Sequence, residues 1–186
     1  MVVPIATLWL PILLSAVFVF IASSIIHMVL PYHHKNYRQL PDEDKVRAVL
    51  RSAGLTPGLY NFPFCTPKQM NTPEAKAKYV EGPVGFMTIF PNGPVVLSKF
   101  LILWFLFCLI VSIFAAYLSG HTTPAGHHFR GVLRVAGTSA LLAYGVGTLS
   151  NGIWKGQPWK IVFLEAFDGF IYALVTGSTF AWLWPQ

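Results

Sequence analysis

The sequence predicts an all-α integral membrane protein with four transmembrane helices and a mostly cytoplasmic loop between the first two. Hydrophobic residues make up 54% of the 186 residues and charged residues only 11%, whereas a soluble domain carries about a quarter charged residues. In addition, four apolar stretches are long enough to cross a bilayer as a helix, which takes about 20 residues. Because hydrocarbon offers no partner to backbone polar groups, each stretch must be helical.

The first stretch, residues 5–30, is expected to be a retained helix. It is longer than the apolar region of a signal peptide, about 7–15 residues. The segment 31–33 that follows it has none of the small residues of a cleavage site. Pro4 and Pro11 fall in its first turns, where proline is better tolerated than in a helix interior.

The loop 31–99 is expected to contain short helices and extended segments. PDEDKVRAVLRSAG (41–54) is expected to be a short amphipathic helix. It has a proline first, acids in its first turn and a glycine at its end, which are signals of a helix start and stop. TPEAKAKYVEG (72–82) has the same form, with Thr72 as cap. LYNFPF and GFMTIF are expected to be short strands or extended pieces on the membrane. Since the loop is too small for a large core, we expect it to pack on the bilayer, on the helix ends or on a partner.

The other three helices are expected at 100–118, 131–149 and 161–184. Stripes of small residues on the last two predict that these helices pack closely as an antiparallel pair. The stripes consist of Ala136, Ala140, Ala143 and Gly147 on the third helix, and of Gly169, Ala173 and Gly177 on the fourth.

Lysine and arginine are concentrated in alternate loops, although the net charge is +6. The basic loops, which by the positive-inside rule lie in the cytoplasm, contain Lys35, Arg38, Lys45, Arg47, Arg51, Lys68, Lys76, Lys78, Lys99, Lys155 and Lys160. The loop between the second and third helices carries only Arg130. Both termini are therefore expected outside. This distribution fits membrane topology better than phosphate contacts, so no nucleic-acid partner is expected.

Polar residues on the fourth helix form the first candidate site. Glu165, Asp168 and Tyr172 recur at three- and four-residue steps and share one face. Asp168 lies roughly 10 Å along the helix from its expected start, where a carboxylate costs about 2.5–3.5 kcal/mol to insert. His27 and Lys99 are expected near the same side of the membrane, so the five residues form a candidate intramembrane cluster. It either handles protons or cations, or it only orients the fourth helix while Glu165 snorkels to the surface.

Histidines at the membrane edges are the second candidate site. The candidate metal ligands are His33 and His34 on one side, and His121, His127 and His128 on the other. Neither group shows the spacing of a known metal site, and adjacent histidines point apart in regular structure, so interfacial polar residues are favoured.

The sequence implies no cofactor. It contains no phosphate-binding loop, serine-nucleophile motif, dinucleotide fingerprint or haem-attachment motif. A b-type haem is disfavoured because His27, the one histidine inside an apolar run, has no partner at equal depth. Cys65 and Cys108 have no spacing that predicts a disulfide or a metal site.

Three segments resemble a set of bacterial inner-membrane proteins with four predicted helices and no assigned activity. They are HHKNYRQLPDED (33–44), PGLYNFPFC (57–65) and DGFIYALVTGSTFAWLWP (168–185). The resemblance implies a multi-pass protein of the bacterial inner membrane. It carries over no functional residue.

Three classes of function follow, and the sequence favours the first. The first class is an accessory, structural or assembly subunit of a larger membrane complex, with the bilayer and other subunits or a second copy as partners. The alternative is a small oligomeric transporter, or a proton- or cation-handling protein, that uses the polar face of the fourth helix. The third is a membrane enzyme acting on a lipid or quinone, with His33, His34, Asp42 and Glu43 as acid–base groups. Such residues are expected in any solvated loop, so we lean against an enzyme.

Overall fold

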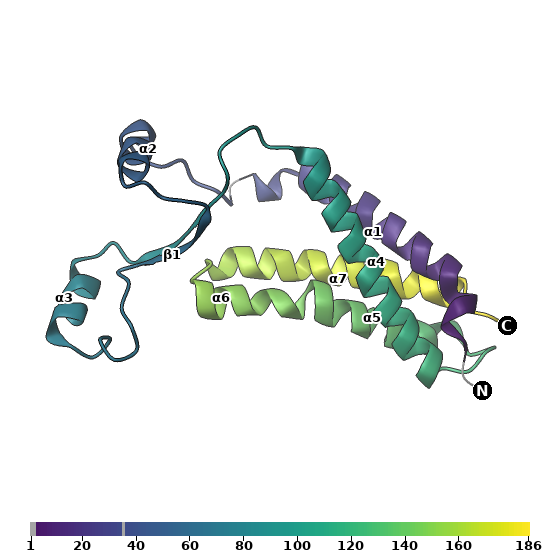
Figure 1. The fold of residues 1–186 in the computed structure, drawn as a ribbon. Coiled ribbons are helices and arrows are strands. Elements are labelled where there is room, and N and C mark those ends of the chain that lie inside the picture. The colour runs from purple at the N-terminus through teal and green to yellow at the C-terminus, as the bar shows by residue number, and fades with distance from the viewer. Residues whose placement is uncertain (1–2, 35) are drawn as a thin grey trace. The chain divides into compact units, whose positions relative to one another are not determined.

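The computed structural model describes residues 3–34 and 36–186 (Figure 1). Lys35, one of the basic residues used to predict topology, lies outside the described residues. The chain divides into two compact units, residues 1–36 with 96–186, and residues 37–95. The coarse prediction, a mostly helical chain with four helices long and apolar enough to cross a membrane, is confirmed.

The larger unit, residues 1–36 and 96–186, contains the four long helices. They are α1 (Trp9–Met28, preceded by the 3-10 turn Ile5–Leu8), α4 (Leu97–Thr122), α5 (Phe129–Tyr144) and α7 (Trp159–Trp182). A 3-10 turn, η3 (Val146–Thr148), and the short helix α6 (Leu149–Lys155) continue α5 after a break at Gly145. The third apolar stretch therefore runs to Lys155 but is interrupted, whereas the sequence suggested one regular helix over 131–149.

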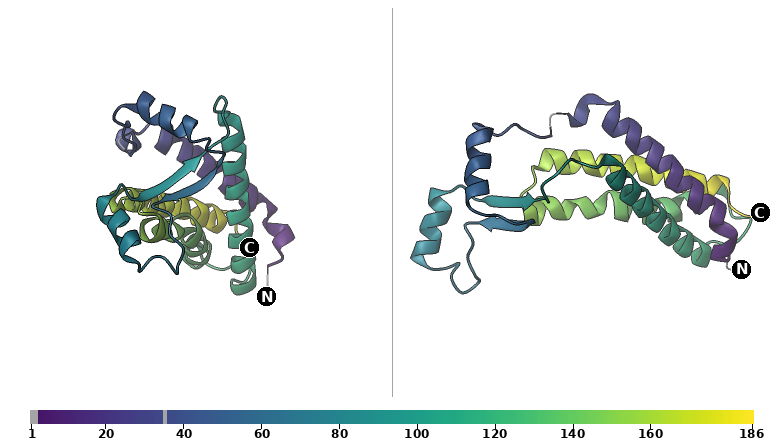
Figure 2. Two further views of the ribbon diagram at one scale, coloured as in Figure 1. Left: turned by 60° about the vertical axis from the view of Figure 1, so that its left-hand side comes forward. Right: turned by 45° about the horizontal axis from the view of Figure 1, so that its top comes forward.

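Helices α5 and α7 lie side by side, and α1 and α4 pack across them (Figure 2). Residues near both ends of the chain bond to the last turn of α4 and to the connection that follows it. The backbone N–H of Val3 donates to the carbonyl of Gly120 at 2.9 Å, and the indole of Trp184 donates to the carbonyl of Pro124 at 2.9 Å. The opposite end of this unit holds the end of α1, the start of α4 and the turn from α6 into α7.

Glycines explain how closely α5 and α7 approach. A Cβ at Gly169 would lie 2.5 Å from the backbone of Gly145, and a Cβ at Gly177 would lie 2.9 Å from the carbonyl oxygen of Leu133. At both places only a hydrogen atom fits between the two backbones.

The small-residue stripes divide between this contact and a cavity. Ala136, Ala140 and Ala173 are buried. Ala143 and Gly147 are exposed and line a cavity instead. The regular helix ends at Tyr144, so the four-residue step that would place Gly147 below Ala143 does not continue.

The smaller unit, residues 37–95, contains two short helices and a hairpin. The helices are α2 (Glu43–Ser52) and α3 (Pro73–Glu81), and the strands are β1 (Gly58–Phe62) and β2 (Gly85–Ile89). The strands pair antiparallel with Tyr60 opposite Met87. The hydroxyl of Thr72 accepts from the backbone N–H of Ala75 at 3.3 Å and so caps α3. Ala75 is the one buried residue in 37–95, all of which the structure describes, so this unit has almost no core of its own.

Candidate functional site

A reversal of the chain after α1 builds the polar part of the site. The helix ends at Met28, and Pro31 opens a 3-10 turn (Pro31–His33) because proline lacks the N–H that a continuing helix needs. The turn brings the ring of His33 back over that of His27. The two imidazoles stack with centroids 4.6 Å apart and planes 10° from parallel.

The carboxylate of Asp168 on α7 receives two side chains from this turn. The hydroxyl of Tyr32 donates to Oδ1 at 2.5 Å, and Nε2 of His33 lies 2.6 Å from Oδ2. Only 3% of the Asp168 side chain and 10% of the His33 side chain are exposed. Each carboxylate oxygen thus has a close partner, which offsets the cost of burying the charge.

Two further bonds hold the imidazoles in place. Nδ1 of His33 lies 2.8 Å from the side-chain amide of Asn36. Nδ1 of His27 lies 3.1 Å from the carbonyl oxygen of Ser23. Because a carbonyl can only accept, this bond places a proton on Nδ1 of His27 and leaves Nε2 of the neutral ring as an acceptor. The hydroxyl of Ser23 itself receives the indole N–H of Trp104 at 2.8 Å.

The hydroxyl of Tyr32 is kept protonated by its surroundings. Burial raises the pKa of this phenol above its ordinary value, and the hydrogen bond and negative charge of Asp168 raise it further. Tyr32 therefore acts as a hydrogen-bond donor to the carboxylate at neutral pH.

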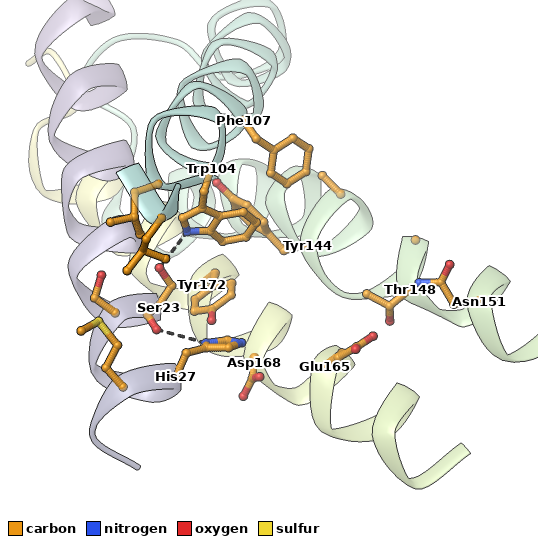
Figure 3. Close-up of a pocket in the computed structure, with 16 residues that line it drawn as sticks. Ser23, His27, Trp104, Phe107, Tyr144, Thr148, Asn151, Glu165, Asp168 and Tyr172 are labelled. Carbon is orange, nitrogen blue, oxygen red and sulfur yellow. Dashed lines mark hydrogen bonds between the residues drawn. The ribbon is translucent and has the colours of Figure 1, made fainter. Parts of the chain in front are cut away.

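A cavity of about 690 Å³ opens beside this cluster (Figure 3). One part of its wall is apolar and aromatic, with the rings of Trp104, Tyr144 and Tyr172 packed at centroid distances of 5.6–6.2 Å. The other part is polar. The polar lining consists of Ser23, Ser24, His27, Thr148, Asn151, Glu165 and Asp168.

Glu165 and Tyr172, two polar residues of the lining, differ in their hydrogen bonding. Oε1 of Glu165 accepts from the side-chain amide of Gln157 at 2.7 Å. The hydroxyl of Tyr172 is buried and has no hydrogen-bond partner among the described residues. A buried donor without a partner calls for an explanation, such as a water or a ligand atom.

The structure brings most of the predicted intramembrane cluster together. His27, Glu165, Asp168 and Tyr172 all line the cavity. Lys99 does not: it is exposed in the first turn of α4 and lies outside the lining. The close partners of Asp168 are His33 and Tyr32 instead.

Of the candidate metal ligands, one belongs to a possible metal-binding group and the others do not. Within the described part of the chain, His33 joins His27 and Asp168, and one ligand atom from each lies within 4.8 Å of the others. His34, next to His33, is exposed. At the other end of the unit, His121 contacts the carbonyl of its own helix, and His127 and His128 stack on each other. The sequence did not point to Tyr32, to Asn36 or to the stacking of His33 on His27, although Pro31 signalled a reversal at this point.

The acid–base groups considered for an enzyme belong to both units. His33 contacts Asp168 in the larger unit and His34 is exposed there, whereas Asp42 and Glu43 are exposed residues of the smaller unit.

No family model, curated protein or solved structure matches the chain. The chain is therefore described by its fold and its site, which are four long apolar helices and a partly aromatic cavity beside the cluster of Asp168, His33 and Tyr32.

Proposed function

We propose that the chain is a multi-pass membrane protein whose four-helix unit binds an amphipathic small molecule in this cavity. Insertion into a bilayer is supported by the length and hydropathy of the four helices. It is also supported by the large apolar side chains that α4 exposes, such as Ile102 at 61% and Phe114 at 62%. A water-soluble monomer rarely exposes such a surface.

The orientation we propose is the one expected from the basic loops, with both termini outside a bacterial inner membrane. Within the larger unit, Val3 and Trp184, near the two ends of the chain, bond to the last turn of α4 and to the connection that follows it. Lys99, Lys155 and Lys160 belong to the opposite end, as the positive-inside rule requires for cytoplasmic connections. The cluster around Asp168 then lies toward the cytoplasmic side.

The observation that carries the binding function is the cavity. Its volume, about 690 Å³, falls within the range of small-molecule sites, about 300–1,000 Å³. Its wall divides into an apolar part, with Leu97, Leu101, Trp104 and Phe107, and a polar part around Asp168. A molecule with an apolar tail and a polar head satisfies both parts at once.

The charges of the lining limit the head group. Two carboxylates, Glu165 and Asp168, line the cavity, and no lysine or arginine does so within the described chain. An anionic head would be repelled and left without a cationic partner. An uncharged or cationic head is compatible, and an acceptor atom on it would satisfy the hydroxyl of Tyr172.

This preference can be measured with single-chain amphiphiles of equal tail length. The purified protein is stripped of lipid, and bound molecules are counted by native mass spectrometry. We expect one molecule of decyl-benzoquinone or of decyltrimethylammonium to be retained, and decyl phosphate to be released. Equal retention of all three, or preference for the phosphate, would contradict the proposed head-group chemistry.

An accessory role in a larger complex is a second candidate, favoured by the smaller unit. Residues 37–95 have almost no core, and they expose Leu59, Phe64, Phe86 and Phe90, so a partner or bilayer surface is needed to cover them. Copurification of one defined subunit from native membranes, crosslinked at Phe86, would support this role, whereas recovery of a lone monomer would count against it. The transporter and membrane-enzyme hypotheses stay predictions.

A further inference from the structure

We propose that His27, His33 and Asp168 form a binding site for a divalent transition metal of the zinc class. Nε2 of each imidazole and one oxygen of the carboxylate are the natural ligand atoms, and the three groups offer atoms within 4.8 Å of one another. Two imidazoles and a carboxylate are a common protein ligand set for Zn²⁺ in sites that keep one position open. Here that open position faces the cavity, which His27 and Asp168 both line.

The outer contacts of the three ligands support the assignment. In metal sites, the second nitrogen of a histidine ligand is held by a carbonyl, carboxylate or similar group, which fixes the ring. Nδ1 of His27 is held by the carbonyl of Ser23 at 3.1 Å, and Nδ1 of His33 is held by Asn36 at 2.8 Å. The second oxygen of Asp168 is held by Tyr32 at 2.5 Å. All three ligands are therefore oriented by groups that do not compete for the metal.

Binding requires one proton to move within His33 and the two stacked rings to turn, because an imidazole nitrogen binds a metal in the plane of its ring and the two planes lie 10° from parallel. Without metal, Nε2 of His33 and Oδ2 of Asp168 share a proton at 2.6 Å. Zinc–ligand bonds of about 2.0–2.2 Å place neighbouring ligand atoms roughly 3.3 Å apart. In the neutral ring this proton moves to Nδ1 of His33, which leaves Nε2 free to bind the metal. The amide of Asn36, whose nitrogen faces Nδ1 without metal, turns so that its oxygen accepts the proton.

The donor set also selects among metals. Calcium and magnesium prefer six or more oxygen ligands, and only one of the three residues offers oxygen. Copper(I) prefers sulfur ligands, and neither cysteine belongs to the group. Borderline ions such as Zn²⁺ and Co²⁺ match two nitrogens and one oxygen.

Cobalt(II) provides the test, because its visible absorption reports the number and geometry of its ligands. The full chain is purified in mild detergent without a histidine tag, freed of metal with a chelator, and titrated with CoCl₂. We expect one equivalent to bind with the intense bands of four- or five-coordinate cobalt, and Zn²⁺ to displace it. His33→Ala and Asp168→Asn should abolish the bands, and Asn36→Ala, which removes only a positioning contact, should weaken binding by about 10–100-fold.

His34→Ala is the matched control, because it removes an exposed neighbouring histidine and should leave the titration unchanged. Each variant is first shown to elute as one symmetrical species. The proposal is overturned if folded wild-type protein gives no such bands. It is also overturned if the bands survive His33→Ala and are lost instead when His127 and His128 are replaced. The metal site does not depend on the proposed amphiphile, whose retention is measured on metal-free protein, so either idea can fail alone.

Discussion

Replacing Gly169 by valine is expected to separate α5 from α7 and to prevent recovery of folded protein. A Cβ at this position would lie 2.5 Å from the backbone nitrogen and Cα of Gly145, and neither of these atoms can rotate away as a side chain would. Overpacking against yielding side chains costs about 1–3 kcal/mol, and contact with backbone should exceed that range. Size-exclusion chromatography and thermal unfolding in detergent measure the effect.

Gly147→Val is the control for this experiment. The nearest atom to a Cβ at Gly147 is the carbonyl oxygen of Leu142 at 3.6 Å, an ordinary contact. This variant should therefore elute and unfold much like the wild type. Equal stability of the two variants would mean that α5 and α7 do not approach as closely as the structure places them.

Replacing Ala143 by phenylalanine is expected to close the cavity and to weaken retention of decyl-benzoquinone by at least about tenfold, which corresponds to 1.4 kcal/mol. Ala143 is exposed and lines the cavity, so the added ring occupies the space of the ligand without disturbing the contact between helices. Native mass spectrometry at increasing ligand concentration measures the change.

Leu142→Phe is the matched control, because Leu142 neighbours Ala143, is 58% exposed and does not line the cavity. It should retain the ligand as the wild type does. If both variants, or neither, lose binding, the molecule binds elsewhere on the apolar surface.

The sequence was sufficient to predict the four apolar helices because each apolar stretch is long and carries at most two charged residues. It could not predict the break at Gly145, since residues 146–149 carry no charge and hydropathy does not distinguish a regular helix from a 3-10 turn. That break matters for the site, because Gly147 and Thr148, which follow it, line the cavity.

The candidate site was predictable only where helix periodicity determines which residues share a face. Glu165, Asp168 and Tyr172 share a face of α7 by periodicity alone. The place of Lys99 could not be predicted, because α4 is apolar all round and its sequence does not fix which face meets the other helices. The contact of His33 with His27 and Asp168 was not predicted. It depends on how the chain reverses after Pro31, and helix periodicity does not describe such a reversal.

Insertion into the membrane with the 37–95 segment inside the cell is the claim on which the proposed function rests, and the natural Cys65 tests it most directly. Cys65 is a free thiol in that segment and is partly exposed, whereas Cys108 is buried. In right-side-out spheroplasts, a membrane-impermeant maleimide should label Cys65 only after permeabilisation, and it should label a Thr122→Cys variant without it. Labelling of Cys65 in intact spheroplasts, or recovery of the chain in the soluble fraction, would contradict the account.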